Sequence, residues 1–336
     1  MAIQPSSFRG NDLSLNDRSE SKCNEENEPE EPPPTVDTNV MFSASSNGCE
    51  EFDPVEERKL VRKMDVLILT NIIICYTFFY LDKTTLSYAA IFGIRNDLDL
   101  EKIEYSWLSS LFYFGFLAWA LPTCLLMQRF PIGKYLGINI FLWGFFLMLQ
   151  ATASSFASLG TLRAIAGAAE SCADPAFVLI TSMWYTRREH PIRLGLWWAA
   201  NGLGVALGGL IGYGIGHISG GIASWKYEFL IIGGLCCIWG VVIFFHLPNS
   251  PVTARQFSDR EKRIIVERKK EDQCGIENKQ FKFYQAVEAA CDGKTYLFLI
   301  LAAASSVPNG GISNFGTLII QGFGFTVLHT TLMQIP

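Results

Sequence analysis

The stretch 159-LGTLRAIAGAAESCADPAFVLITSM-183 decides the fold of this chain. It is mostly apolar, and as a helix with a rise of about 1.5 Å per residue it can cross the roughly 30 Å hydrocarbon core of a bilayer. The stretch nevertheless contains three charged residues, Arg163, Glu170 and Asp174. At about 100° per residue, Glu170 and Asp174 each lie about 20° from Arg163, so one narrow stripe of the helix carries all three charges.

A charge at mid-membrane costs at least about 2.5 kcal/mol, so this stripe is expected to face a polar cavity or a partner. Two interpretations remain open. The charges form an internal salt bridge that only fastens helices together, or they line a pathway for substrate or protons.

Composition indicates an all-α integral membrane protein. Of the 336 residues, 49% are hydrophobic, and the mean hydropathy is +0.23. Of 32 acidic and 27 basic side chains, 14 acidic and 3 basic ones lie in residues 1–57, so this segment carries a charge of −11 and the remainder +6. The basic residues of the remainder sit in short loops rather than in one patch, which argues against a nucleic-acid partner. The nine cysteines show no metal-type spacing, so no metal site is expected.

Apolar runs separated by charged loops predict the organisation of the chain. Residues 1–57 are expected to form a disordered acidic cytosolic tail, 58–250 a six-helix half, 251–294 a cytoplasmic linker, and 295–336 the start of a second half. The charge bias of the loops places the N terminus and the linker in the cytoplasm. The predicted spans are 66–91, 105–127, 135–153, 159–183, 194–216, 225–247 and 296–320, and an eighth begins at Leu328.

The linker contains 258-SDREKRIIVERKK-270, in which Ser258 is a helix-capping residue and Ile264 and Ile265 are apolar amid charges. We expect a short cytosolic helix along the membrane surface. Its charge run is interpreted as a solvated, lipid-facing surface.

The first span contains the polar cluster 80-YLDKTTLSYA-89. Because the first span runs outward and the fourth runs inward, Asp82 and Arg163 are both expected in the outer half of the bilayer. The hypothesis is that Asp82 or Glu170 balances Arg163, and that an anionic substrate or a proton changes this pairing. The alternative is that Asp82 and Lys83 mark the outer end of a shorter helix and reach water.

Small residues in the fifth span recur every seven positions, at Gly195, Gly202 and Gly209, which predicts close helix packing with a possible rocking contact. The seventh span contains 307-VPNGGISNF-315. Pro308 and Gly310 are expected to interrupt regular helical hydrogen bonding, so that Asn309 and Asn314 contact substrate in a cavity. A hinge without substrate contact is the equal alternative.

Several of these segments resemble the major facilitator superfamily: LDKTTLSYA, RAIAGAAESCADPAF, MWYTRREHPIRLGLW and YGIGHI. HLPNSPVTARQFSDREKRIIVER and VPNGGISNFGTLIIQGFGF are similar to its fungal anion:cation symporter family, of the allantoate permease type. The resemblance runs from about residue 58 to the end. Lys83, Thr85 and Asp174 depart from the usual pattern, where Arg, Asn and a neutral residue are expected.

The resemblance implies a twelve-helix fold with substrate between two six-helix halves. It also implies uptake of a small organic anion, such as a ureide, a vitamin or a related carboxylate, across the plasma membrane. The proton would be the coupling ion, and no other cofactor is implied. Arg163 is the expected anion or counter-ion residue, with Glu170, Asp82 and Asp174 as proton-coupling or charge-pairing residues. Lys83 is also expected on the substrate or proton pathway.

About four and a half helices of the second half are missing relative to that family. We therefore expect either a fragment of a complete transporter or a truncated product, and the latter would not transport alone. A truncated sensor or regulatory membrane protein is the alternative function. A membrane enzyme is not expected, because no nucleophile elbow, phosphate loop or His-Glu metal pattern is present in the sequence.

Overall fold

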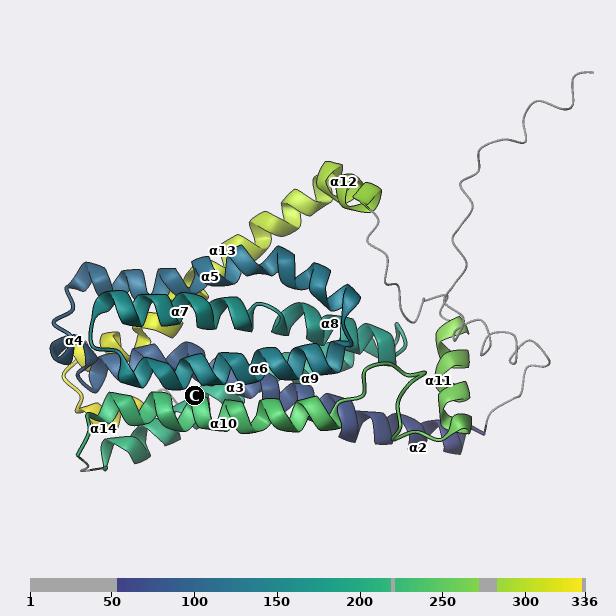
Figure 1. Ribbon diagram of the computed structural model, residues 1–336, viewed down its shortest axis with the longest axis horizontal. Helices are drawn as coiled ribbons and strands as arrows, with labels where there is room; N and C mark the ends of the chain where they lie inside the picture. The colour runs from purple at the N-terminus through teal and green to yellow at the C-terminus, as the bar shows by residue number, and fades with distance from the viewer. Residues whose placement is uncertain (1–52, 219–220, 272–282, 334–336) are drawn as a thin grey trace, which may run out of the picture. The chain divides into compact units, whose positions relative to one another are not determined.

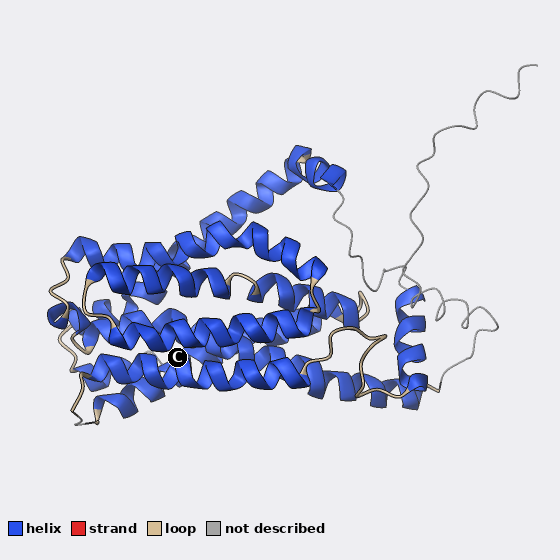
Figure 2. Cartoon of the chain, viewed as in Figure 1, coloured by secondary structure: helices blue, strands red, loops and turns tan. Residues whose placement is uncertain are grey.

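The computed structural model describes residues 53–218, 221–271 and 283–333. Within these ranges every regular element is a helix (Figures 1 and 2). The α-helices are α2 Pro54–Met64, α3 Thr70–Ile91, α4 Ile94–Asp97, α5 Lys102–Arg129, α6 Ile132–Leu149, α7 Phe156–Glu170, α8 Ala173–Trp184, α9 His190–Gly216, α10 Ser224–His246, α11 Asp259–Glu271, α12 Phe283–Cys291, α13 Gly293–Gly322 and α14 Val327–Leu332. A π-helical segment, Asp65–Leu69, joins α2 to α3.

Seven helical segments in the described part of the chain are long and apolar enough to cross a membrane: 54–91, 103–129, 132–152, 156–184, 190–216, 224–246 and 293–322. Each of them overlaps one of the seven predicted spans, so the prediction of an all-helical membrane protein is confirmed. The short α14 lies where the eighth span was expected to begin.

The first span begins twelve residues earlier than predicted, at Pro54 instead of Val66. The Asp53 side chain accepts a hydrogen bond of 3.0 Å from the Val55 amide, and Pro54 occupies the first helical position, where its missing N–H costs nothing. Residues 54–57, which were assigned to the acidic tail, are therefore helical. The rest of that predicted tail, up to residue 52, lies outside the described residues.

Helix α3 is the centre of the bundle. It packs along α9 and also contacts α10 and α13, while α6 packs along α10 and α5 along α7. Most of its side chains from Ile72 to Ile91 are buried, polar ones included. Because α3 touches three spans, its polar residues lie against several neighbours at once, and this is what builds the candidate site.

Helices α5 and α7 cross with almost no side chain between them. A Cβ placed on Gly115 would lie 1.9 Å from the Ala164 carbonyl oxygen, and one placed on Gly167 would lie 2.1 Å from that of Phe112. No Cβ fits at such distances, so only glycine permits this approach. Small residues that let two backbones meet are the usual means of packing helices in lipid.

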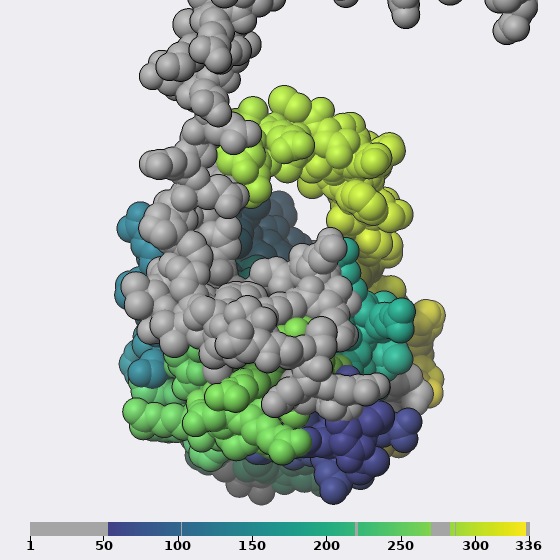
Figure 3. All heavy atoms as spheres, turned by 90° about the vertical axis from the view of Figure 1, so that its right-hand side faces the viewer, coloured from purple at the N-terminus to yellow at the C-terminus, as the bar shows by residue number. Residues whose placement is uncertain are grey.

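Helix α11 packs one face against the protein, whereas its charge run was interpreted as a solvated, lipid-facing surface. Asp259, Arg260 and Arg263 are exposed. Ile264, Ile265 and Val266 are buried, and α11 lies beside α2 (Figure 3). Lys63 of α2 lies 2.8 Å from Glu261, and Arg260 lies 2.8 Å from Glu56. Acids and bases on each of the two helices thus pair with the opposite charge on the other, and these ion pairs hold α11 against α2.

The basic end of α11 is also bound to the turn between α8 and α9. Arg268 lies 2.7 Å from Glu57 and 2.8 Å from Glu189. The ammonium of Lys269 is buried and donates to the carbonyl oxygens of Ser182 and Tyr185, at 2.5 and 3.1 Å. These carbonyls end α8, where a cation is favoured by the helix dipole. Helix α11 is thereby fixed to α2, to the end of α8 and to the turn before α9.

Candidate functional site

A group of five charged side chains lies between α3 and the α7–α8 segment. Asp82 and Lys83 come from α3, Arg163 and Glu170 from α7, and Asp174 from α8. Asp82, Arg163 and Glu170 have exposed fractions of 1, 3 and 2%. All five residues that we predicted from charge alone are therefore brought together by the fold.

Asp82 is held by an aromatic donor. The indole Nε1 of Trp143, on α6, donates a hydrogen bond of 2.9 Å to Oδ2 of Asp82. The other carboxylate oxygen has no hydrogen-bond partner among the residues described. Its electrostatic neighbours are Arg163, Glu170 and Lys83. Asp82 therefore lies inside the bundle, and the alternative that it reaches water at a helix end is wrong.

Arg163 is packed between aromatic rings. Its guanidinium carbon lies 5.8 Å from the ring centre of Phe112 and 5.9 Å from that of Phe229. Nε and Nη2 are buried without a hydrogen-bond partner in the described part of the chain. The expected approach of Asp82 to Arg163 is present as an electrostatic interaction. Within the described ranges it is not a direct ion pair shorter than 4.0 Å, so the guanidinium keeps donors for another acceptor.

Glu170 ends α7, and neither of its buried carboxylate oxygens has a described hydrogen-bond partner. The chain then turns at Ser171 before α8 begins at Ala173, whereas the apolar stretch 159–183 predicts one continuous helix. Pro175 explains the break. It has no N–H for the carbonyl of Ser171, four residues earlier, and its ring crowds that carbonyl. The break leaves Glu170 at a helix end rather than on a continuous stripe.

Lys83 and Asp174 are half-buried at the edge of this group. The Lys83 ammonium lies 4.0 Å from the ring centre of Phe79 and 4.8 Å from that of Tyr80. It interacts electrostatically with Glu170 and Asp174. Lys83 thus links the buried charges to Tyr80, which faces the other side of α3.

On that side a polar cavity of about 200 Å³ lies between α3, α9 and α13. Eight of its ten lining residues have a polar group: Tyr80, Thr84, Ser87, Tyr88, Asn201, Asn309, Ser313 and Thr317. Asn309 was predicted to contact a cavity, and the structure places it there. Its Oδ1 accepts a hydrogen bond of 3.3 Å from the Ser313 hydroxyl.

Asn314 does not line this cavity. The side-chain amide of Asn314 donates a hydrogen bond of 2.9 Å to the Gly310 carbonyl oxygen. The backbone carbonyl of Asn314 accepts a hydrogen bond of 3.0 Å from the Tyr105 hydroxyl. Helix α13 also runs unbroken through Pro308 and Gly310, so the predicted interruption is wrong. Pro308 removes one backbone donor, and the helix continues beyond it.

The close contact of α9 lies on a different face from the one predicted. No atom lies within 4 Å of a Cβ built on Gly195, Gly202 or Gly310, while Gly209 is buried. Glycines four apart make the contact instead. A Cβ on Gly204 would lie 2.7 Å from Tyr80 Cβ, and one on Gly208 would lie 3.0 Å from Thr84 Oγ1. Both approaches bring α9 against the polar face of α3.

Sequence reasoning missed several residues of the cavity and one buried acid. Tyr80, Thr84 and Ser87 recur at positions i, i+4 and i+7, a spacing that places them on one helix face. Glu228 stands in an apolar span. It is fully buried, and neither carboxylate oxygen has a described hydrogen-bond partner. Both signals are visible in the sequence.

The sequence pattern of the Major Facilitator Superfamily matches residues 72–336. This chain belongs to the major facilitator superfamily. Like other members, it is a multi-pass membrane protein. The match begins inside α3 and includes every residue of the charged group and of the cavity.

Relatives in fungi are transporters of this superfamily. The uncharacterized transporter C460.05 of Schizosaccharomyces pombe is 42% identical over 85% of this chain and 54% of its own length. The allantoate permease of Saccharomyces cerevisiae is 37% identical over 85% of this chain and 54% of its own. The thiamine pathway transporter THI73 of Saccharomyces cerevisiae is 35% identical, with corresponding shares of 87 and 55%. The chain spans about half the length of these relatives.

A solved structure supports the same fold. The bacterial homolog of the human lysosomal transporter Spinster, in an inward-facing and occupied conformation, has a TM-score of 0.60 with 15% identity. The match covers 79% of this chain and 56% of that one. At this identity the likeness concerns the arrangement of the helices.

Proposed function

We propose that this chain forms the first half, and the start of the second, of a proton-coupled importer of small organic anions. Its cytoplasmic end would be the one with α2 and α11, and the membrane the plasma membrane. The observation that carries the proposal is the group of buried charges at Asp82, Arg163 and Glu170, whose unpaired polar atoms lie inside a spanning bundle. A structural salt bridge would leave fewer such atoms unpaired.

Charge balance supports coupling to a proton. With Asp82, Glu170 and Asp174 ionised against Arg163 and Lys83, the group carries a net charge of −1. An entering anion is then repelled in a medium of low dielectric constant. Protonation of one carboxyl group removes the net charge and frees Arg163 for the anion. Binding of the anion together with a proton is therefore favoured, and binding of the anion without the proton is disfavoured.

The cavity supplies a place for the anion. Tyr80 lines it, and the Lys83 ammonium lies 4.8 Å from the Tyr80 ring, so positive charge stands directly behind the cavity wall. Asn201 and Asn309 offer amide donors and acceptors from α9 and α13. A carboxylate with amide groups, as in a ureide, matches such a lining.

The relatives favour a substrate class rather than one compound. An allantoate permease and a thiamine pathway transporter are similarly related to this chain. We assign the chain to the allantoate permease type of symporter, with ureides and related carboxylates as first candidates. Since the relatives are transporters, no catalytic activity is proposed.

The test begins with the length of the mature protein in the source cell, and uptake of allantoate is measured with that product. Arg163→Gln should lower uptake at least about a hundredfold at unchanged surface expression, since the anion loses its buried counter-charge. Arg58→Gln, an exposed charge on α2, is the control and should leave uptake unchanged. Normal uptake by Arg163→Gln would refute the proposal.

A further inference from the structure

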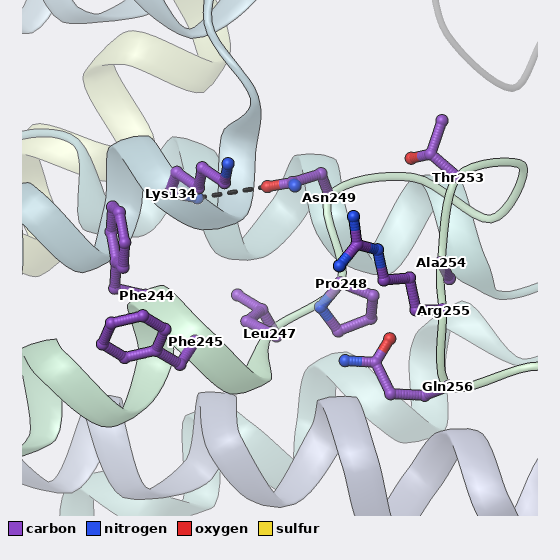
Figure 4. A pocket seen from close by; sticks show the side chains of 10 residues that line it. All are labelled: Lys134, Phe244, Phe245, Leu247, Pro248, Asn249, Thr253, Ala254, Arg255 and Gln256. Carbon is purple, nitrogen blue, oxygen red and sulfur yellow. Dashed lines mark hydrogen bonds between the residues drawn. The ribbon is translucent and has the colours of Figure 1, made fainter.

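A second cavity, of about 400 Å³, lies at the end of the bundle that also bears α2 and α11. It is formed by the start of α6, the end of α10 and the loop that follows α10 (Figure 4). It is separate from the charged group and from the cavity at Asn201. None of its residues has a part in the proposed transport.

Close packing shapes this cavity. A Cβ on Gly133 would lie 2.7 Å from the Leu247 carbonyl oxygen, so the start of α6 touches the end of α10 directly. The amide of Lys134 donates a hydrogen bond of 3.2 Å to Oδ1 of Asn249, drawn as a dashed line in Figure 4. The loop is thus fixed to α6, and the cavity is a built feature of the fold.

The polar side of the cavity is basic. Lys134 and Arg255 lie on either side of Asn249 in Figure 4. Both are exposed, and neither has an ion-pair partner within 4.0 Å among the described residues. Thr253 and Gln256 add neutral polar groups, and no acidic residue lines the cavity. Two unpaired cations beside hydroxyl and amide groups form a site for an anion.

The other side of the cavity is apolar. Phe244 and Phe245 belong to the last turns of the spanning helix α10, and Phe245 is 72% exposed. An exposed aromatic ring at the end of a span faces acyl chains or the interface. The ligand must therefore combine an anionic group with an apolar body next to it.

We propose that this cavity binds the headgroup of an anionic phospholipid. The phosphate and carboxylate oxygens would lie between Lys134 and Arg255, and the acyl chains would pass over Phe244 and Phe245. The placement agrees with the leaflet, because anionic lipids are concentrated on the cytoplasmic side, where we place this end of the bundle. A free phosphate ion would gain nothing from the two aromatic rings.

The test is native mass spectrometry of the purified full-length chain with dioleoylphosphatidylserine or dioleoylphosphatidylcholine. The wild-type protein should retain phosphatidylserine at least about tenfold more strongly. Each of these two cations would contact the headgroup directly and contribute about a factor of five, so Lys134→Gln with Arg255→Gln should weaken retention about 25-fold. The matched control is Arg58→Gln with Lys59→Gln, which removes two exposed charges from α2 at the same end and should change retention less than threefold.

Three results would overturn the proposal. They are equal retention of the two lipids by the wild-type protein, equal loss in the control variant, and release of bound phosphatidylserine by millimolar inorganic phosphate, which would make the site one for free anions. The charge-preserving variant Lys134→Arg with Arg255→Lys should retain the lipid, which separates loss of charge from loss of fold.

Discussion

The indole nitrogen of Trp143 donates a 2.9 Å hydrogen bond to Asp82, so a residue of α6 fixes a carboxylate of α3 inside the membrane-spanning bundle. Within the described residues, Oδ2 of Asp82 accepts this hydrogen bond and Oδ1 has no hydrogen-bond partner, so Oδ1 can respond to the charges of Arg163 and Glu170. Trp143 thereby sets the orientation of the carboxylate that we propose to balance Arg163.

Replacing Trp143 by Phe should disturb this site without emptying the core. The ring volume is largely kept, but Asp82 loses its donor, so the free energy of unfolding should fall by about 1 to 3 kcal/mol. Thermal unfolding of the purified protein measures this. Trp107→Phe, at a half-exposed ring of α5, should change stability by less than about 0.5 kcal/mol. Equal effects of the two variants would contradict a special role for Trp143.

Glu170→Gln keeps the shape of the side chain and removes one negative charge from the group. The remaining charges sum to zero, so anion uptake should persist but lose its acceleration by external acid. Uptake by the full-length product between pH 5 and 7.5 shows this, with Glu267→Gln on α11 as the control. A pH profile identical to that of the wild-type protein would mean that Glu170 does not carry the proton.

Asn201→Ala should weaken binding of the substrate in the cavity between α3, α9 and α13. Loss of one hydrogen bond there should raise KM about tenfold. Asn71→Ala is the matched control, because Asn71 bonds to the Leu67 carbonyl and does not line the cavity. The concentration dependence of uptake separates the two, and an unchanged KM in Asn201→Ala would exclude the amide from the substrate site.

Gly115→Ala and Gly167→Ala should prevent α5 and α7 from meeting. Each added methyl group would clash with a backbone carbonyl, so the helices must separate, at a cost of about 3 kcal/mol or more. The yield of folded protein in size-exclusion chromatography should fall sharply. Gly202→Ala, with open space around it, should fold normally, and its failure would show that the glycine contacts are not the cause.

The ion pairs of α11 should stabilise the protein unequally. Arg268, only 11% exposed, pairs with two glutamates, whereas Arg260 is 71% exposed. Arg268→Gln should cost about 2 kcal/mol and Arg260→Gln less than about 0.5. Thermal unfolding at pH 7 compares them, and an equal cost would refute the difference in burial as the cause.

Lowering the pH should weaken the ion pair between Arg268 and Glu189. Burial alone would raise the pKa of Glu189, but the Thr186 amide and Arg268 outweigh it and lower that pKa below the ordinary value of 4.5. A depressed pKa in the folded state contributes stability above pH 4.5 and loses it as pH falls through the lowered value. Arg268→Gln should therefore show a smaller loss of stability than the wild-type protein between pH 5 and 3.

The membrane-spanning helices could be predicted from the sequence, because a span requires about 20 consecutive, mostly apolar residues. That the five charged residues lie together inside the bundle was also predictable, because an ionised side chain is costly in lipid and must face a partner or a polar cavity. Which glycines touch a neighbour was not predictable. Helix α9 has glycines both seven and four apart, and only the position of α3 selects Gly204 and Gly208.

Proline gave opposite results at two positions. Pro175 accompanies a break before α8, whereas α13 continues through Pro308. The residue type removes the same hydrogen bond in each case, so the outcome depends on the packing around it. The linker helix shows a similar limit. Its charges suggested a solvated surface, but the structure shows that Arg260 and Arg268 pair with acids of α2 and that Arg268 also pairs with Glu189.

The break between α7 and α8 has a mechanical consequence. Helix α8 is a stiff rod of 12 residues, about 18 Å long. At one end of α8, Asp174 interacts electrostatically with Glu170. At the other end, Lys269 of α11 donates hydrogen bonds to the carbonyl oxygens of Ser182 and Tyr185. Tilting this rod by about 10° around the break would move its far end by about 3 Å. A tilt of α8 that starts at the buried charges would therefore be transmitted to helix α11 through Lys269.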